Sequence, residues 1–116
     1  MDLWWQRWGG APGAGTLAVS LFGYENAGLP QLLDHWADSG ASVLVLIPDS
    51  KLRVAAGRWV DNRHLVPQLD AGLCRYRTGR LEIRYLPFLA QDEYDHLLWA
   101  CDCNFVRGEE IGRAHV

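Results

Sequence analysis

The chain has 116 residues, 49% of them hydrophobic, and six tryptophans, which excludes an intrinsically disordered protein and allows one domain with a buried core. Its net charge of −3 argues against general affinity for nucleic acid, because neutralising phosphate groups requires a basic surface. No apolar run approaches the roughly 20 residues that a membrane-spanning helix needs, so we expect no membrane contact.

The first 15 residues predict a short helix followed by a flexible break. Trp4, Trp5 and Trp8 have helical spacing and would form one face that needs a surface to pack against. Residues 9–15, GGAPGAG, are typical of a flexible linker. We therefore interpret residues 1–15 as the remnant of an interdomain helix and linker, and we expect the three tryptophans to be exposed.

Residues 16–47 predict a strand, a helix and a second strand. Thr16–Gly23 is short, apolar and partly β-branched, as expected for a buried strand. Pro30 suits the first turn of a helix, and Gly40 suits its end. Ala41–Ile47 is an uninterrupted apolar run, which is typical of a strand buried on both faces of a parallel sheet.

Residues 48–86 predict a second helix and then a hairpin. Ser50 is placed to cap a helix over Lys51–Val60. Asn62–Gly72 carries only weak signals and is predicted to be a loop. Leu73–Arg77 and Leu81–Leu86 flank a Thr-Gly-Arg turn, which favours a β-hairpin.

The last elements complete an alternation of strands and helices. Gln91–Cys101 is predicted to be a helix, and Asn104–Val106 a short strand. Such alternation indicates an α/β fold with a mainly parallel sheet flanked by helices. We interpret residues 16–110 as one domain of this class.

Four arginines gather around the hairpin, at Arg75, Arg77, Arg80 and Arg84. Alternating arginines are typical of the solvent face of a β-ribbon, and this is the interpretation that we adopt.

The three cysteines predict thiols in a reducing cytoplasm, because an odd and scattered set makes no disulfide framework. Cys101 and Cys103 flank a single residue, but a zinc site needs two further ligands at workable spacing, and none is nearby. We therefore expect buried structural thiols, and neither a metal nor another cofactor.

Candidate binding residues follow three of the predicted strands. In open parallel sheets, ligands bind beyond the carboxyl ends of the strands. That rule selects Phe22–Asn26, Pro87–Gln91 and Arg107–Glu109. We expect all three segments to open on one edge of the domain.

These segments carry the chemistry of a nucleotide site. The rings that can enclose a flat base are those of Phe22, Tyr24, Phe88 and Tyr94. Gln91 can donate to and accept from a pyrimidine edge, and Arg107 can hold a diphosphate with its fork of donors. Glu109 can accept hydrogen bonds from sugar hydroxyls.

A nucleotide sugar fits better than a nucleoside triphosphate, because the chain has neither a Walker loop nor a Gly-x-Gly-x-x-Gly turn. Other interpretations stay open at this point. Taken singly, Phe22 and Phe88 fit core residues better than ligand contacts. Tyr94 fits an ordinary helix residue equally well, and Arg107 fits a surface ion-pair partner equally well.

Two long motifs resemble a known family. SLFGYEN at 20–26 and LPFLAQDEYDHLLWACDCNFVRGE at 86–109, together with the segments between them, resemble the C-terminal part of the elongation-factor-P arginine rhamnosyltransferases (EarP). The resemblance implies a partial Rossmann-like C-terminal domain of a GT-B glycosyltransferase. Such an enzyme transfers L-rhamnose from TDP-L-rhamnose to one arginine of elongation factor P, with inversion and without a metal.

The resemblance also implies roles for individual residues. The thymine pocket would contain the residues Phe22, Tyr24, Phe88, Gln91 and Tyr94. Arg107 would meet the diphosphate, and Glu109 would lie near the transferred sugar as the catalytic candidate. Glu110 stands where the family has an acidic residue, usually Asp, and is counted with the substrate-binding residues.

The resemblance implies that the catalytic base is an aspartate of the N-terminal domain, and we expect that domain to lie outside these 116 residues. The alternatives to this assignment are another GT-B nucleotide-sugar transferase and a non-catalytic α/β binding domain.

The last residues depart from the family pattern, which continues with Asp, Ser and an aromatic-rich helix. The codons GAG ATC GGA AGA GCA CAC GTC of a common sequencing adapter encode Glu-Ile-Gly-Arg-Ala-His-Val, the sequence of residues 110–116. We therefore interpret residues 111–116 as adapter read-through, with a divergent natural tail as the alternative, and we expect the chain by itself to be an inactive fragment.

Overall fold

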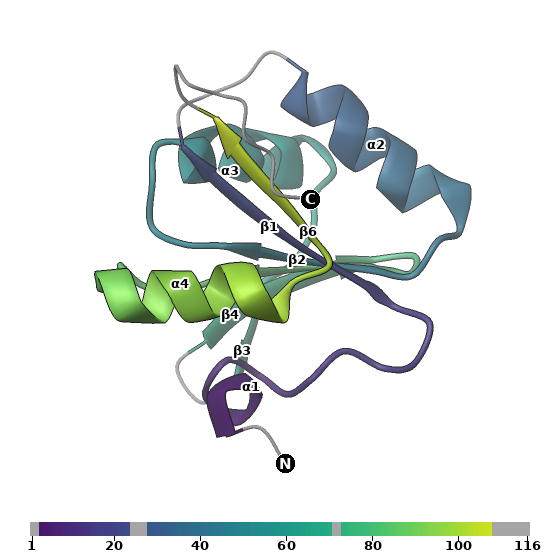
Figure 1. Ribbon diagram of the computed structural model, residues 1–116. Coiled ribbons are helices and arrows are strands. Elements are labelled where there is room, and N and C mark those ends of the chain that lie inside the picture. Colours follow the sequence, from purple (N-terminus) through teal and green to yellow (C-terminus); the bar gives the residue numbers. More distant parts are fainter. Residues whose placement is uncertain (1–2, 24–27, 71–72, 108–116) are drawn as a thin grey trace.

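A computed structural model describes residues 3–23, 28–70 and 73–107, with residues 70 and 105–107 described as backbone alone. A six-stranded sheet lies between two layers of helices (Figure 1). The strands are β1 (Leu17–Gly23), β2 (Val43–Ile47), β3 (Gln68–Asp70), β4 (Leu73–Thr78), β5 (Leu81–Tyr85) and β6 (Cys103–Arg107). The helices are α1 (Leu3–Arg7), α2 (Leu29–Ser39), α3 (Leu52–Asn62) and α4 (Gln91–Ala100).

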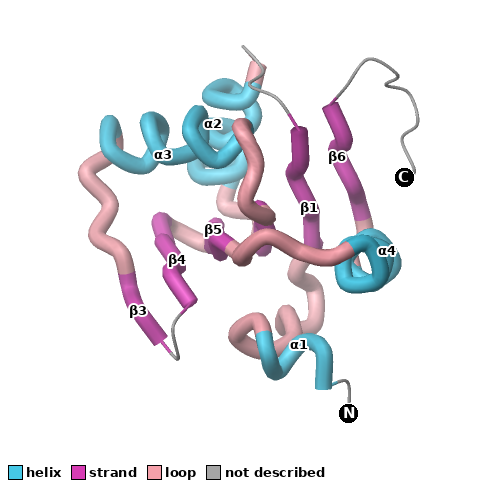
Figure 2. The backbone as a smooth tube through the Cα atoms, turned by 90° about the vertical axis from the view of Figure 1, so that its left-hand side faces the viewer, coloured by secondary structure: helices cyan, strands magenta, loops and turns pink. Residues whose placement is uncertain are grey.

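The sheet is mainly parallel, as predicted. Its strand order is β3-β4-β5-β2-β1-β6. The pairs β1–β2, β1–β6 and β2–β5 are parallel, whereas β3–β4 and β4–β5 are antiparallel. Figure 2 shows the helices α2 and α3 on one face of the sheet, and α1 and α4 on the other. The predicted α/β class is therefore confirmed.

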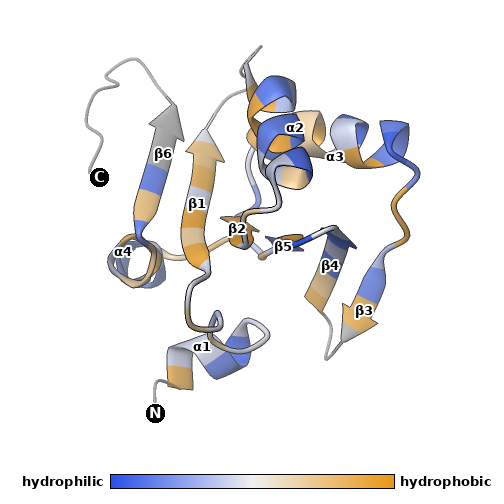
Figure 3. Cartoon of the chain, turned by 90° about the vertical axis from the view of Figure 1, so that its right-hand side faces the viewer, coloured by the Kyte–Doolittle hydropathy of each residue, from blue (hydrophilic) through white to orange (hydrophobic). Residues whose placement is uncertain are grey.

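The face under α2 and α3 holds one half of the core. Val19 and Val45 from the central strands pack with Leu33 of α2 and Trp59 of α3, and all four side chains are buried. All five residues of β2 are buried, which confirms the prediction of a strand covered on both faces. Figure 3 shows β1 and β2 largely in the hydrophobic colour, while α2 and α3 carry hydrophilic residues. Burying each such aliphatic side chain contributes roughly 1.5–3 kcal/mol.

The opposite face holds the second half of the core, which includes the N-terminal tryptophans. Trp4, Trp5 and Trp8 are only 7%, 8% and 7% exposed and pack with Leu46 and Leu97. The expectation that they would be exposed was therefore wrong. The helical spacing was correct, but the surface that this face covers lies within the chain itself, between β2 and α4.

The local signals along the chain had different outcomes. Pro30 lies in the first turn of α2, and Gly40 ends that helix in a left-handed conformation with φ of 81°. Ser50 was wrongly predicted as a side-chain cap, because α3 begins after Lys51 without a side-chain cap hydrogen bond. The predicted loop over Asn62–Gly72 contains the short edge strand β3, whose pairing with β4 had no signal in its own composition.

The hairpin of β4 and β5 forms as predicted, but its arginines do not all face solvent. The Arg84 side chain is only 5% exposed, and that of Arg75 is 12% exposed. The prediction of a solvent-facing arginine ribbon is therefore wrong for these two residues. Both side chains are held by Glu82, from the same face of the sheet.

Candidate functional site

The carboxyl ends of β1 and β6 lie next to each other at one edge of the sheet. In the parallel pairing of these strands, Phe22 is opposite Val106 and Gly23 is opposite Arg107. The backbone of Arg107 therefore lies beside the end of β1, and the two predicted segments meet at this edge.

The end of β5 reaches the same edge through β2. Ile47 pairs with Tyr85, and the Leu86 amide donates to the Ile47 carbonyl at 2.9 Å. Since β2 lies directly beside β1, the segment that follows β5 also opens here. The prediction of a common edge is therefore confirmed for all three strands.

Phe22 and Tyr94 form an aromatic pair at this edge. Their ring centroids are 4.9 Å apart and the rings are tilted by 50°. Phe22 comes from the end of β1, and Tyr94 from the first half of α4, which covers this face of the sheet. Both side chains are half-buried, so each is partly accessible to solvent. Two residues predicted to enclose a base are thus brought together.

The Tyr94 hydroxyl is a hydrogen-bond donor at physiological pH. Burial raises its pKa above the ordinary value, and the charge of Asp95 raises it further. The phenol therefore stays protonated.

Gln91 and Phe88 are exposed residues of the segment that leads from β5 into α4. Gln91 is the first residue of α4, one helical turn before Tyr94, so both side chains share a side of the helix. The exposed Gln91 side chain donates from Nε2 to Asp95 Oδ1 at 3.0 Å. Phe88 is 77% exposed, which rules out the alternative that it is a core residue. The structure gives Phe88 no ring contact with Phe22 or Tyr94.

Several predicted residues cannot be placed. Tyr24, Glu109 and Glu110 lie outside the described residues, and Arg107 is described as backbone alone. Their side-chain roles stay predictions, as do the domain boundaries and the interpretation of residues 111–116.

Polar residues beneath the site fix β6 against β1, and the sequence analysis did not single them out. The Ser20 hydroxyl donates to Asn104 Oδ1, and Asn104 Nδ2 donates to the Leu98 carbonyl at 3.0 Å. Asp102 makes two bonds to Ala18, one through its carboxylate and one through its amide, both at 2.8 Å. Two buried polar residues inside apolar strands, Ser20 and Asn104, were the signal that could have revealed this pairing.

The start of α4 is electrostatically favourable for its acidic residues. Asp92 and Glu93 lie in the first turn, where the helix dipole stabilises negative charge. Glu93 also pairs with Arg7 at 2.7 Å, which ties α1 to α4. Glu93 therefore has a structural partner in Arg7, and Asp92 accepts from the Glu93 amide at 3.0 Å.

The cysteines are thiols with no disulfide between them. Burial raises the pKa of Cys101 to about 12, with smaller contributions from Asp102 and Cys103. Within residues 3–23, 28–70 and 73–107, no group of three metal-ligating side chains comes together. Over the same residues, no helix has the length and apolar character needed to cross a membrane.

Sequence comparisons identify the relatives of this chain. The sequence model of a family described as Elongation-Factor P (EF-P) rhamnosyltransferase EarP matches residues 1–115. The protein-arginine rhamnosyltransferase of Pseudomonas aeruginosa is 40% identical over 96 residues, which are 83% of this chain and 24% of that protein. Its counterpart in Pseudomonas putida is 38% identical over 96 residues, with the same coverage. The Shewanella oneidensis protein of that name is 36% identical over 98 residues, 78% of this chain and 23% of that protein.

A solved structure shares the fold. It comes from work described as "Structural basis for EarP-mediated arginine glycosylation of translation elongation factor EF-P". The match has a TM-score of 0.74 and 35% sequence identity, and it covers 92% of this chain and 34% of that chain. This domain therefore has the fold of the matching part of EarP, a GT-B glycosyltransferase, as predicted. The chain spans about a quarter of the length of the curated relatives it matches.

Proposed function

The chain belongs to the EarP family of elongation factor P rhamnosyltransferases, and on that premise we propose that it forms the nucleotide-sugar-binding part of such an enzyme. The donor would be TDP-L-rhamnose, and the acceptor would be an arginine of elongation factor P. Because this acceptor serves translation, the reaction would take place in the cytoplasm. The observation that carries the proposal is the match of nearly the whole chain to the family, with the aromatic pair at the strand edge.

The base of the donor would bind at the pair of Phe22 and Tyr94. Stacking a base on an aromatic side chain contributes roughly 1–3 kcal/mol. Gln91 lies one turn before Tyr94 and has both a donor and an acceptor for the thymine edge. Phe88 is exposed in the segment before α4 and would cover the base from the solvent side when the donor binds.

The diphosphate would extend from the base towards the end of β6. Gly23 is opposite Arg107 in the β1–β6 pairing, so the backbone of Arg107 lies within the same edge as the aromatic pair. A guanidinium group at this position would neutralise the negative charge that develops on the departing diphosphate, without a metal. Glu109 and Glu110, two and three residues further on, would face the transferred sugar.

The acceptor requires a separate base. An arginine guanidinium is protonated at neutral pH and is a poor nucleophile until a carboxylate orients it and removes a proton. In the proposed reaction this base is the aspartate that the family resemblance places in the N-terminal domain. The described residues of this chain would contribute donor binding and leaving-group stabilisation.

Calorimetric titration of the chain with TDP, UDP and GDP tests the donor assignment. We expect TDP to bind most tightly, and Tyr94→Ala to weaken its binding about tenfold or more through lost stacking. Trp99→Ala is the matched control, because Trp99 lies on the same helix but is 89% exposed. That variant should bind TDP like the wild type.

The other outcomes separate the alternatives. Tighter binding of UDP or GDP would identify a different nucleotide-sugar transferase. If circular dichroism shows a folded chain that binds none of the three nucleotides, the domain is not a donor site.

A further inference from the structure

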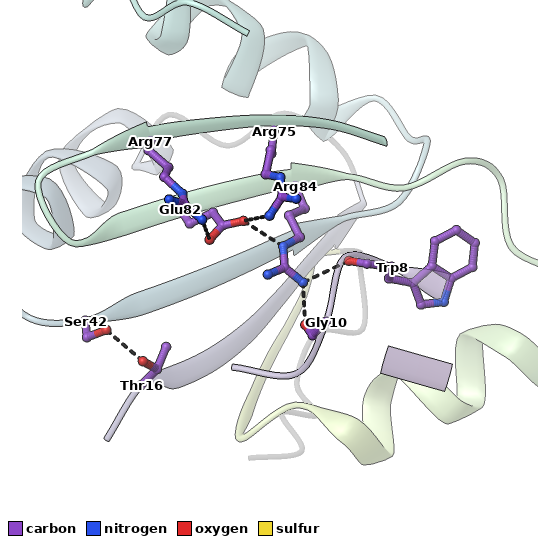
Figure 4. Close-up of polar contacts among 8 residues, drawn as sticks. All are labelled: Trp8, Gly10, Thr16, Ser42, Arg75, Arg77, Glu82 and Arg84. Carbon is purple, nitrogen blue, oxygen red and sulfur yellow. Dashed lines mark hydrogen bonds and ion pairs between the residues drawn. The ribbon is translucent and has the colours of Figure 1, made fainter. Parts of the chain in front are cut away.

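Four arginines line a polar hollow at the edge of the sheet opposite to the aromatic pair. Figure 4 shows three of them, Arg75, Arg77 and Arg84. The hollow has a volume of about 340 Å³, roughly ten times that of a water molecule in the liquid. Its lining includes the start of β2, the turn before β5 and the linker after α1. The arginines that line it are Arg75, Arg77, Arg80 and Arg84.

One carboxylate organises three of these arginines. Glu82 Oε2 accepts from Arg84 Nε at 2.7 Å and from Arg75 at 3.2 Å, and Glu82 Oε1 lies 3.4 Å from Arg77. Arg84 also donates to the carbonyls of Trp8 and Gly10, at 2.8 and 2.7 Å. Figure 4 shows the three guanidinium groups converging on this single side chain. Arg84 and Glu82 therefore form a fixed frame that is tied to the linker.

The described lining of the hollow has more basic than acidic side chains. Among the described residues that line the hollow, Glu82 is the one acidic side chain against four arginines. In the β4–β5 pairing, Arg75 is directly opposite Arg84, an arrangement that is unfavourable for like charges. Burial raises the pKa of Glu82, but the hydrogen bond and charge of Arg84, with Arg75 and Arg77, outweigh it and hold the pKa below its ordinary value. The carboxylate thus stays ionised and still neutralises only part of the cluster.

The remaining wall offers hydroxyl groups. Thr16 Oγ1 and Ser42 Oγ lie 2.7 Å apart in a hydrogen bond, at the amino ends of β1 and β2. Figure 4 shows this pair apart from the arginine cluster, at the start of the neighbouring strands. Clustered guanidinium groups with nearby hydroxyls are the donors that phosphate oxygens prefer.

We propose that this hollow binds a small oxyanion of the phosphate class, held by Arg75, Arg77 and Arg80 over the frame of Arg84 and Glu82. The side chain of Arg77 is 56% exposed and Arg80 is exposed, so both can turn towards an anion without breaking the core. The site lies at the amino ends of the strands whose carboxyl ends carry the proposed donor site. It does not rest on the proposed function.

The test is a titration of the ¹⁵N-labelled chain with inorganic phosphate, at constant ionic strength set with chloride. We expect saturable shifts of amides in residues 9–16, 42–44 and 75–84, and none at 20–23 or 91–95. Arg77→Gln with Arg80→Gln should weaken binding about tenfold, because charge-assisted hydrogen bonds are lost at exposed positions where folding is unaffected. Arg58→Gln is the matched control, since Arg58 is an exposed arginine of α3 on the other face of the sheet.

A second titration of the same labelled chain uses thymidine monophosphate. The same shifts with this ligand would show that the hollow accepts a phosphate group carried on a larger molecule, whereas shifts with inorganic phosphate alone would show a free anion site. Three results would overturn the proposal: no saturable shifts, shifts confined to the opposite edge, or equal weakening by Arg58→Gln and by the double variant.

Discussion

Replacing Glu82 by glutamine should destabilise the domain far more than the same substitution in an exposed ion pair. Glu82 is the carboxylate partner of Arg84, whose side chain is only 5% exposed and lies 2.7 Å away. Glutamine keeps the shape and one accepting oxygen but removes the negative charge. The variant therefore leaves a buried guanidinium beside two further arginines without its counter-charge.

The burial of this ion pair sets the size of the expected loss in stability. Removing one partner of a buried ion pair costs about 3–5 kcal/mol. The Glu82 side chain is 16% exposed, and its replacement can still accept one hydrogen bond, so we take the lower limit of about 3 kcal/mol. For a domain of this size, that free energy lowers Tm by roughly 12 °C.

The same carboxylate gives the stability a pH dependence with a definite sign. The arginines hold the folded-state pKa of Glu82 below its unfolded value. The unfolded chain therefore binds the proton more readily, and Glu82 stabilises the fold fully above the unfolded pKa of about 4.3. This contribution is lost as the pH falls through the folded pKa. The difference between wild type and Glu82→Gln should thus shrink below about pH 4.

The assay is thermal and urea unfolding followed by circular dichroism, with Glu93→Gln as the control. The Arg7–Glu93 pair has the same 2.7 Å separation, but its side chains are 55% and 29% exposed. Exposed pairs contribute about 0–1 kcal/mol, so the control should lower Tm by only a few degrees. If both variants lose the same stability, or if the Glu82→Gln loss is independent of pH, the reasoning from burial fails.

Three further variants or probes test other parts of the structure. Trp4→Ala should lower the free energy of unfolding in urea by about 3–5 kcal/mol, because Trp4 is buried against α4. Trp99→Ala, at an exposed position, should change it by less than about 0.5 kcal/mol, and equal losses would contradict the packing of α1. Gly40→Ala should lower the free energy of unfolding by about 1 kcal/mol, because φ is 81° at this position. No atom lies within 4 Å of the new Cβ, so the cost is backbone strain alone, and an unchanged free energy of unfolding would contradict the left-handed end of α2. Cys101 should react with iodoacetamide at pH 8 much more slowly than Cys103, because burial raises the pKa of the Cys101 thiol to about 12. Mass spectrometry of the natively alkylated chain measures both rates, and faster alkylation of Cys101 would contradict its burial.

Much of the fold was predictable because local chemistry and tertiary structure agree. The apolar run of β2 required burial on both faces, and Pro30 with Gly40 set the limits of α2. The Thr-Gly-Arg turn specified the hairpin of β4 and β5, where Gly79 adopts a positive φ of 60°. At Pro30, Gly40 and Gly79 the backbone preference of the residue decides the local structure, and no distant contact is needed.

The misplaced residues depend on contacts between distant segments. Trp4 and Trp8 were wrongly expected to be exposed. The surface that they cover is formed by β2 (Val43–Ile47) and α4 (Gln91–Ala100), which both lie far along the chain from them. Arg84 is buried because it donates to carbonyls of the linker, 76 and 74 residues earlier. No local pattern contains such partners.

The candidate site was also predicted in part. The rule for parallel sheets correctly brought the ends of β1, β5 and β6 to one edge. Which rings touch depended on the position of α4 over β1, and this joined Phe22 with Tyr94 but left Phe88 exposed.

Mass spectrometry of elongation factor P tests the central claim most directly. The factor would be incubated with TDP-L-rhamnose and the protein encoded at the locus of this chain. The account predicts the addition of one rhamnosyl group to one arginine of the factor. The addition should be lost in Arg107→Gln and kept in Arg58→Gln. An unchanged mass with the wild-type protein would contradict the assignment.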